Sequence, residues 1–185
     1  VARSLASLAE HSLAVRRVAD ALAGELLPPD AAVAVTKAAH LHDLGKAHPV
    51  FQETMRRTSG YDGPELLAKS TLPGKHKRPH FRHELAGALR WLDVAPQDAW
   101  KALVVYLVAA HHGKVRLSLR NFPGDALPPQ SGQLSARGVW DGDELPDADL
   151  GDGMTVPGGS VSLAAMLLGR RDGMPSWAEM VIALR

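Results

Sequence analysis

The chain has 185 residues, enough for one domain with a sizeable core, and its 45% hydrophobic and 22% charged residues exclude disordered, collagen-like and mucin-like chains. It contains no cysteine, which excludes a disulfide framework, a thiolate metal site and a cysteine nucleophile and leaves nine histidines and the carboxylates for metal chemistry. The net charge is +1, but residues 37–120 carry 14 Lys/Arg against 7 Asp/Glu, so this basic part either faces an anionic partner or is solvated helix surface.

Helical spacing of apolar residues runs through most of the chain and predicts an all-α fold, a compact helical bundle. The first helix is expected to carry the apolar residues from Leu8 to Leu26 and to end at Pro28-Pro29. A second helix is expected over about 31–44, with Gly45 as its stop. A short amphipathic helix should follow from Pro49 to about Arg57, and residues 58–79, rich in Gly, Pro, Lys and Ser, should form a loop.

The second half of the chain predicts fewer helices. One helix should start near Phe81 and end before Pro96, and residues 97–112 predict a buried helix that stops at Gly113. Strand-like alternation is confined to about 115–119, and residues 121–159 collect Gly, Pro and Asp without periodicity, which predicts a long irregular insertion. Helical spacing returns over 160–168, and Ser176 with Glu179 forms a capping box that opens a last helix.

The organisation expected from these elements is a single domain, residues 1–185. The chain begins without Met and its last predicted helix is short, so we expect these residues to be one piece of a longer polypeptide. No run of 18 apolar residues and no signal-peptide pattern is present, which predicts a cytoplasmic protein that does not enter a membrane.

The most specific local string is AHLHDLGK, residues 39–46, at the end of the second predicted helix. Its His42 and Asp43 lie about 100° apart around a helix axis, close enough for both to reach one metal cluster. An Asp in an Ala- and Leu-rich helix is costly to bury unless it is paired or coordinated. Taken alone, however, the pair also fits a polar cap at the end of a surface helix.

Further histidines stand at the ends of other predicted helices. His11 lies one helix upstream, His83 opens a later helix, and His111 and His112 close the most hydrophobic one. A single histidine on an apolar face is usually a core residue, but a set at four helix ends predicts metal ligands. Imidazole and carboxylate together suit borderline divalent metals such as Mn, Fe, Co, Ni or Zn. His40 points to a different face from His42, so a supporting or surface role is expected for it.

Four strings carry a family resemblance: Glu10-His11-Ser12, Leu41 to Lys46, Arg82-His83-Glu84 and Ala110 to Gly113. As a set they resemble the metal-dependent HD phosphohydrolase superfamily, and within it the HD nuclease domain of the CRISPR-associated helicase-nuclease of type I interference systems. The resemblance covers roughly residues 5–115. It implies an HD-domain bundle that uses two divalent metal ions (Mn, Co, Ni, Fe or Mg) to cut single-stranded DNA, with a helicase and a guide-RNA surveillance complex as partners.

The resemblance also implies a role for each site residue. His11 and His42 would bind the first metal, Asp43 would bridge both metals, and Lys46 would contact the scissile phosphate or the attacking water. The second metal would be bound by three further histidines: His83, His111 and His112.

The family pattern ends with an Asp on a late helix, for which this sequence offers no convincing match. We expect that residue beyond Arg185. Asp172 stands in a turn-like string, and the other acidic residues of the late segment are expected in a solvated loop: Asp141, Asp143, Asp147, Asp149 and Asp152.

A basic run precedes His83 and contains Lys75, Lys77, Arg78 and Arg82. It is expected either to guide a nucleic-acid backbone toward the metals or to be a flexible basic loop. Three functions stay open at this point. The chain is a metal-dependent nuclease for single-stranded DNA, an HD phosphodiesterase or phosphohydrolase for a small or cyclic nucleotide, or an inactive docking module. Helicase motor motifs are absent from these residues, so the motor is expected elsewhere in the chain or on a separate protein.

Overall fold

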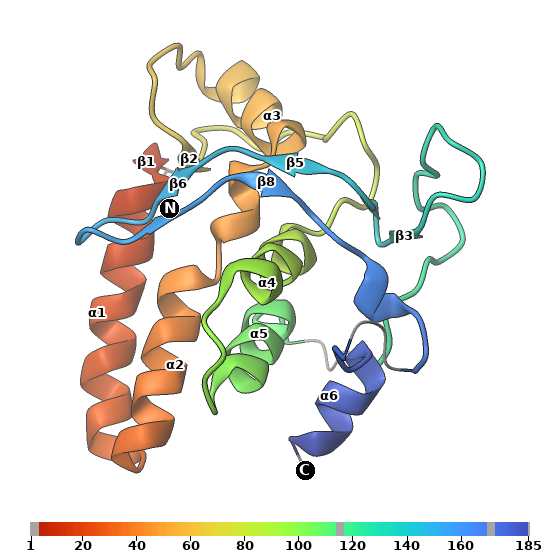
Figure 1. The fold of residues 1–185 in the computed structure, drawn as a ribbon. Helices are drawn as coiled ribbons and strands as arrows, with labels where there is room; N and C mark the ends of the chain where they lie inside the picture. The colour runs from red at the N-terminus through yellow and green to blue at the C-terminus, as the bar shows by residue number, and fades with distance from the viewer. Residues whose placement is uncertain (1–3, 114–116, 170–172, 185) are drawn as a thin grey trace.

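The computed structural model describes residues 4–113, 117–169 and 173–184. Helices dominate this part of the chain, which confirms the predicted all-α class (Figure 1). The helical elements are α1 (Leu8–Leu26), α2 (Pro29–Leu41), the 3-10 turn η1 (Leu44–Ala47), α3 (Pro49–Ser59), α4 (His83–Val94), α5 (Lys101–Ala110), the 3-10 turn η2 (Ala164–Met166) and α6 (Trp177–Ala183).

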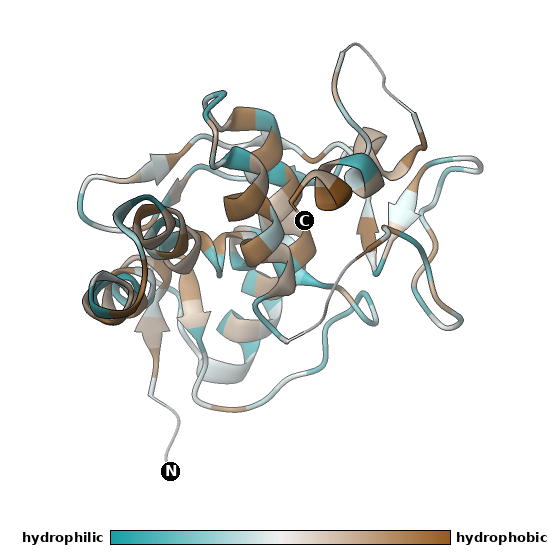
Figure 2. Ribbon diagram, turned by 90° about the horizontal axis from the view of Figure 1, so that it is seen from below, coloured by the Kyte–Doolittle hydropathy of each residue, from teal (hydrophilic) through white to brown (hydrophobic). Residues whose placement is uncertain are grey.

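The helices pack around one apolar core. Figure 1 shows α1 and α2 side by side as a hairpin; α2 also contacts α5, and α5 contacts α4. Viewed from below, hydrophobic residues are concentrated on the helices in the middle of the molecule (Figure 2). The largest fully buried side chains include Leu8, Leu41, Leu85, Leu89 and Trp177. The capping boxes that Ser7 forms with Glu10 and Ser176 with Glu179 start α1 and α6 where the sequence predicts them.

The end of α2 differs from the prediction in a way that matters for the site. The helix stops at Leu41 rather than near residue 44, and Asp43 (φ −100°, ψ 6°) leads into η1. A Cβ atom on Gly45 would lie 1.9 Å from the carbonyl oxygen of His83 and 2.6 Å from the amide nitrogen of Gly87. The backbone of η1 therefore lies directly against α4, at a distance that only glycine permits.

The apolar helix α5 is shorter than the predicted 97–112. The Asp98 side chain accepts a hydrogen bond from the backbone N–H of Trp100 (2.9 Å), which forms a turn before the helix begins at Lys101. At the other end, Gly113 adopts a positive φ of 72°. Part of the strand-like stretch 115–119 lies outside the described residues, and 117–119 form no strand.

The segment 58–79, predicted as a loop, contains the short strand β2 (Leu67–Lys69), which pairs antiparallel with β1 (Ala6–Ser7). Gln52 on α3 fixes this strand beside η1. Its side-chain amide donates to the carbonyl oxygens of Lys46 (2.7 Å) and Leu67 (2.9 Å), and its side-chain oxygen accepts from the N–H of Leu67 (2.9 Å).

Residues 121–159 form no helix, as predicted, but the segment is packed rather than loose. Its two-residue strands are β3 (Ser135–Ala136), β4 (Val139–Trp140), β5 (Glu144–Leu145), β6 (Ala148–Asp149), β7 (Thr155–Val156) and β8 (Gly159–Ser160), paired as β3-β4, β5-β8 and β6-β7. Figure 1 shows the β5 to β8 ribbon crossing over the helices. His40 Nε2 lies 2.8 Å from the carbonyl oxygen of Leu150, and Arg90 on α4 donates to the carbonyl oxygens of Pro157 and Gly158.

The predicted helix at 160–168 is wrong. Between β8 and η2 the chain forms no regular element, and Leu163 (φ −95°, ψ 14°) leads into the 3-10 turn η2. Val161 and Leu163 are buried while Ser162 between them is partly exposed. The apolar residues that suggest a helix in the sequence are thus buried from a non-helical stretch.

One acidic residue of this segment contradicts the expectation of a solvated loop. Asp143 is 9% exposed and accepts hydrogen bonds from Arg78 (2.5 Å) and from the backbone N–H of Trp140 (2.8 Å), with His48 Nε2 at 3.5 Å. The Arg78 guanidinium also lies 3.5 Å from the centre of the Trp140 ring. Burial favours the neutral acid, but the hydrogen bonds from His48 and Arg78 outweigh it and hold the pKa of Asp143 below its ordinary value.

The other acidic residues divide between roles. Asp141 accepts from the N–H of Leu163 and Asp147 from that of Gly158, whereas Asp152 forms an exposed ion pair with Arg16. Asp172 lies outside the described residues. No helix in the described part of the chain is long and apolar enough to cross a membrane.

The buried Asp143 ion pair should contribute much more stability than the exposed Asp152 pair. We expect Asp143→Ala to lower the free energy of unfolding by about 3–5 kcal/mol, because it leaves the Arg78 charge buried without its partner. The control Asp152→Ala should lower it by less than about 1 kcal/mol. Urea unfolding at neutral pH measures both, and equal effects would contradict this view of the pair.

The contribution of Asp143 has a predicted pH dependence. Because its pKa is lower in the folded than in the unfolded chain, the ionised carboxylate stabilises the fold above the unfolded value of about 4. That contribution is lost as the pH falls through the folded pKa. The stability difference between the unchanged chain and Asp143→Ala should therefore shrink below about pH 4.

Candidate metal centre

The ends of four helices meet at one point beside η1. His11 comes from the first turns of α1, the pair His42 and Asp43 follows α2, and His83 is the first residue of α4. His111 and His112 come directly after α5. All six residues that the sequence predicts as metal ligands are thus brought together, in the two groups His11, His42, Asp43 and His83, His111, His112.

Asp43 lies between the two groups and is 2% exposed. Its Oδ2 lies 3.3 Å from His11 Nε2 and 3.2 Å from His42 Nε2, whereas its Oδ1 lies 3.1 Å from His83 Nε2. Burial acts to raise its pKa, but the three histidine side chains beside it outweigh burial and hold the pKa far below the ordinary value. The residue is therefore a carboxylate at any physiological pH, with one oxygen directed to each group.

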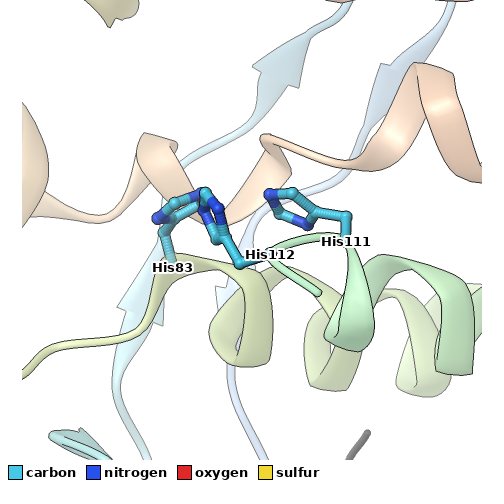
Figure 3. Close-up of side chains that lie close together, drawn as sticks. All are labelled: His83, His111 and His112. Atoms are coloured by element: carbon cyan, nitrogen blue, oxygen red, sulfur yellow. The ribbon is translucent and has the colours of Figure 1, made fainter. Parts of the chain in front are cut away.

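The second group consists of imidazoles alone (Figure 3). His83 Nε2 and His112 Nε2 lie 3.3 Å apart, and the ring centres of His111 and His112 are 4.2 Å apart. Burial lowers the pKa of each of these three histidines. They are accordingly neutral near pH 7, and neutral imidazole is the form that binds a metal.

Backbone contacts fix which nitrogen of two histidines is free to bind. His42 Nδ1 lies 2.7 Å from the carbonyl oxygen of Ala39, and His111 Nδ1 lies 2.8 Å from that of Val108. A carbonyl only accepts, so Nδ1 carries the proton and Nε2 presents its lone pair. Among the described residues, the buried Nε2 of His111 has no hydrogen-bond partner. Such an orphaned acceptor beside two further imidazoles fits a bound metal ion.

Lys46 contacts the same carboxylate. Its Nζ donates to Asp43 Oδ2 (2.7 Å) and to the carbonyl oxygen of Ala68 in β2 (3.0 Å), and its side chain is 16% exposed. The predicted catalytic pair Asp43 and Lys46 is therefore in direct contact. Strand β2, whose Ala68 carbonyl accepts this hydrogen bond from Lys46, was predicted as a loop.

Two neighbours of the site were not predicted. Glu84 is 1% exposed, and its Oε2 lies 3.7 Å from His83 Nδ1, on the side of the ring away from Asp43. Glu84 directly follows the ligand candidate His83 in the sequence, and this position is the signal from which its place at the site could have been predicted. Phe51 on α3 places its ring 4.9 Å from that of His83. No local sequence pattern predicts this contact, because Phe51 and His83 are 32 positions apart.

The predicted basic residues lie in different environments. Lys75 and Lys77 are exposed, and Lys77 pairs with Glu53. The guanidinium of Arg78 is committed to Asp143, with its side chain 13% exposed, so it is not free for a backbone phosphate. Arg82 is partly exposed, and within the described chain its buried Nε has no hydrogen-bond partner.

Two other expectations concern residues outside the ligand set. His40 is 4% exposed and bound to the carbonyl oxygen of Leu150, so it supports the fold and does not reach the cluster. In the described part of the chain, the group around His11 contains no carboxylate other than Asp43. The further Asp expected from the resemblance stays a prediction.

Comparison with known families gives a match that covers most of the chain. A family model described as "Cas3, HD domain" matches residues 1–142, which include the whole predicted ligand set. Neither the search of curated proteins nor the search of solved structures found a match.

Loss of the shared carboxylate should weaken metal binding to both groups. We expect Asp43→Ala to lower the affinity of the metal-stripped chain for Mn²⁺ or Co²⁺ by at least about 100-fold, measured by isothermal titration calorimetry, because it removes the carboxylate that lies between the two groups of described residues. The control His80→Asn replaces an exposed histidine at φ 61° outside both groups, where Asn tolerates the backbone conformation. Equal metal affinity in Asp43→Ala and in the control would exclude Asp43 as a metal ligand.

Proposed function

The chain belongs to the Cas3 HD-domain family and is a CRISPR-associated, metal-dependent nuclease domain, and from this premise we propose that it hydrolyses phosphodiester bonds in single-stranded DNA. Its proposed place is type I interference. There it degrades a strand that a helicase, on the same or another chain, has unwound after a guide-RNA surveillance complex has marked the target.

The observation that carries this proposal is the buried carboxylate shared by two donor groups. In this proposal, His11, His42 and Asp43 would hold one divalent ion, and Asp43 with His83, His111 and His112 would hold a second. Two such ions would activate a water molecule and stabilise the charge on a phosphate during in-line displacement. The mixed imidazole and carboxylate set suits Mn, Co, Ni or Fe, and Mg is the further candidate.

The chain's own residues prepare the site for an anionic substrate. Asp43 stays ionised because its histidine contacts hold its pKa low, so it would be available as a ligand to both ions over the physiological pH range. Lys46 is fixed by Asp43 and by the Ala68 carbonyl, which keeps a compact positive charge next to the cluster. A fixed charge at this place stabilises negative charge that develops on the phosphate without reorganising.

Binding of the DNA backbone is assigned to cations that precede α4 and are at least partly exposed. We propose Lys75, Lys77 and Arg82 for this role and exclude Arg78, because its guanidinium is paired with Asp143. Contacts of this kind are made to phosphates and carry no sequence information. Cleavage is thus expected to be largely independent of DNA sequence and to weaken as the salt concentration rises.

The function is tested with circular single-stranded DNA beside a panel of cyclic nucleotides, each with Mn²⁺, Co²⁺, Ni²⁺ or Mg²⁺. We expect the unchanged chain to cut the circle and Asp43→Ala to leave it intact. Cleavage of circular DNA identifies an endonuclease, because a circle has no end from which an exonuclease could start. Intact DNA with turnover of a cyclic nucleotide would instead identify a small-molecule phosphodiesterase, and no turnover despite bound metal would favour a docking module.

Lys46 should affect turnover more than metal binding. We expect Lys46→Ala to lower kcat on single-stranded DNA by about 100-fold, the effect typical of losing one charge-stabilising donor, while the affinity for metal changes little. Lys37→Ala is the matched control, since Lys37 lies on α2 and its ion pair is with Asp98, away from the cluster. An unchanged kcat in Lys46→Ala would remove this residue from the mechanism.

A further inference from the structure

A cavity of about 680 Å³ opens next to the metal centre, between α3, β2 and residues 73–76. Its volume lies within the range of about 300–1,000 Å³ that is typical of small-molecule sites in proteins. The residues that line it and matter here are Phe51, Met55, Lys69, Ser70, Pro73 and His76.

Two of the residues that line the cavity also contact residues of the metal centre. Ala68 lines it, and the carbonyl oxygen of Ala68 holds Lys46. Phe51 also lines it, and the ring of Phe51 packs 4.9 Å from that of the ligand candidate His83. Lys69 borders both this cavity and a second, shallower hollow that contains His11. A ligand that fills the cavity is therefore directly beside the metal centre.

Aromatic rings form part of the cavity wall. The rings of Phe51 and His76 pack 4.1 Å apart at 36°, next to the apolar side chains of Met55 and Pro73. The Thr54 hydroxyl donates to the carbonyl oxygen of Val50 (3.1 Å) and so accepts from His76 Nδ1 (3.0 Å).

This contact sets the hydrogen-bonding character of His76. With its proton on Nδ1, the ring offers Nε2 as an acceptor, and burial lowers its pKa so that it is neutral near pH 7. A wall with aromatic faces, apolar side chains and one acceptor suits a planar base, which has both a π-face and N–H donors.

Positive charge surrounds the opening. Lys69 and Lys75 are exposed, and Arg57, also exposed, donates to the carbonyl oxygen of Lys75 (3.0 Å). Within the described chain, the residues that line the cavity include no Asp or Glu. The acidic residue on the same helix, Glu53, is paired with Lys77. The entrance therefore favours an anionic ligand.

We propose that this cavity binds one nucleotide of the DNA strand being cut, with its base against Phe51 and His76 and its phosphate at Lys69. The proposal rests on the nuclease function proposed above and adds a binding subsite to it. The strand then continues past Lys69 to the metal centre. Stacking on aromatic rings accepts every base, so the subsite strengthens binding without selecting a sequence.

The test compares two substrates of the metal-loaded chain. One is a single-stranded oligonucleotide, which can fill the cavity with a neighbouring nucleotide, and the other is bis(4-nitrophenyl) phosphate, a small diester that has no nucleobase and no second phosphate. We expect Ser70→Trp, which fills the cavity, to lower the ratio of kcat/KM for the oligonucleotide to kcat/KM for the small diester by about tenfold or more. Lys69→Ala should lower this ratio through a raised KM. Arg17→Ala, an exposed cation that lines neither hollow, is the matched control.

Photo-cross-linking tests the subsite without a variant. Iodouridine-substituted single-stranded DNA, irradiated with the metal-free unchanged chain, should attach to Phe51, Met55 or His76, located by mass spectrometry of the peptides. Unchanged ratios in both variants, or attachment elsewhere only, would overturn the subsite while leaving the nuclease intact. If the unchanged chain hydrolyses neither substrate, the proposed function fails, and cross-linking still decides whether the cavity holds a nucleotide.

Discussion

Asp43 carries a carboxylate that is almost completely removed from water, and burial of an unpaired charge would cost several kcal/mol. Its two oxygens are instead contacted by His11, His42, His83 and Lys46. These partners come from α1, α2, η1 and α4, so one anion requires four elements to end at the same place. The contact between the η1 backbone at Gly45 and α4 at Gly87 brings the elements close enough. The arrangement of these elements thus supplies the partners that the buried carboxylate of Asp43 requires.

That the ligand candidates lie close together could be predicted from the sequence, because the signals are local. Each histidine stands beside a helix end that caps, prolines or glycines mark, and the string around Asp43 is specific. The same holds for α1, whose bounds follow from its apolar spacing and its cap. The partners of Arg78 and Lys46 could not be predicted in this way, because Asp143 and Ala68 lie 65 and 22 residues away. Pairings at such separations depend on the assembled fold and leave no periodic pattern.

The wrong helix at 160–168 and the missed strand β2 share a cause. Short apolar segments fit helix and extended chain almost equally well, and the choice depends on which residues find a buried place. Val161 and Leu163 enter the core from a non-helical stretch, and Leu67 does so from β2 while Gln52 satisfies its backbone groups. The cavity beside the metal centre exists only because β2 forms and faces α3. The cavity could therefore not be predicted from the sequence, because strand β2 was not predicted.

The ribbon formed by β5 to β8 also has a consequence for how the molecule folds. The ligand candidates among the described residues lie within the first 112 residues, yet helices that carry them are bound by carbonyl groups much later in the chain. His40 reaches over 110 residues to Leu150, and Arg90 over 67 to Pro157. Closing such long loops is slow, because the chain loses entropy before the contacts compensate for it. During synthesis, the ligands therefore leave the ribosome well before the segment that clamps their helices, and the finished geometry of the centre is a late event in folding.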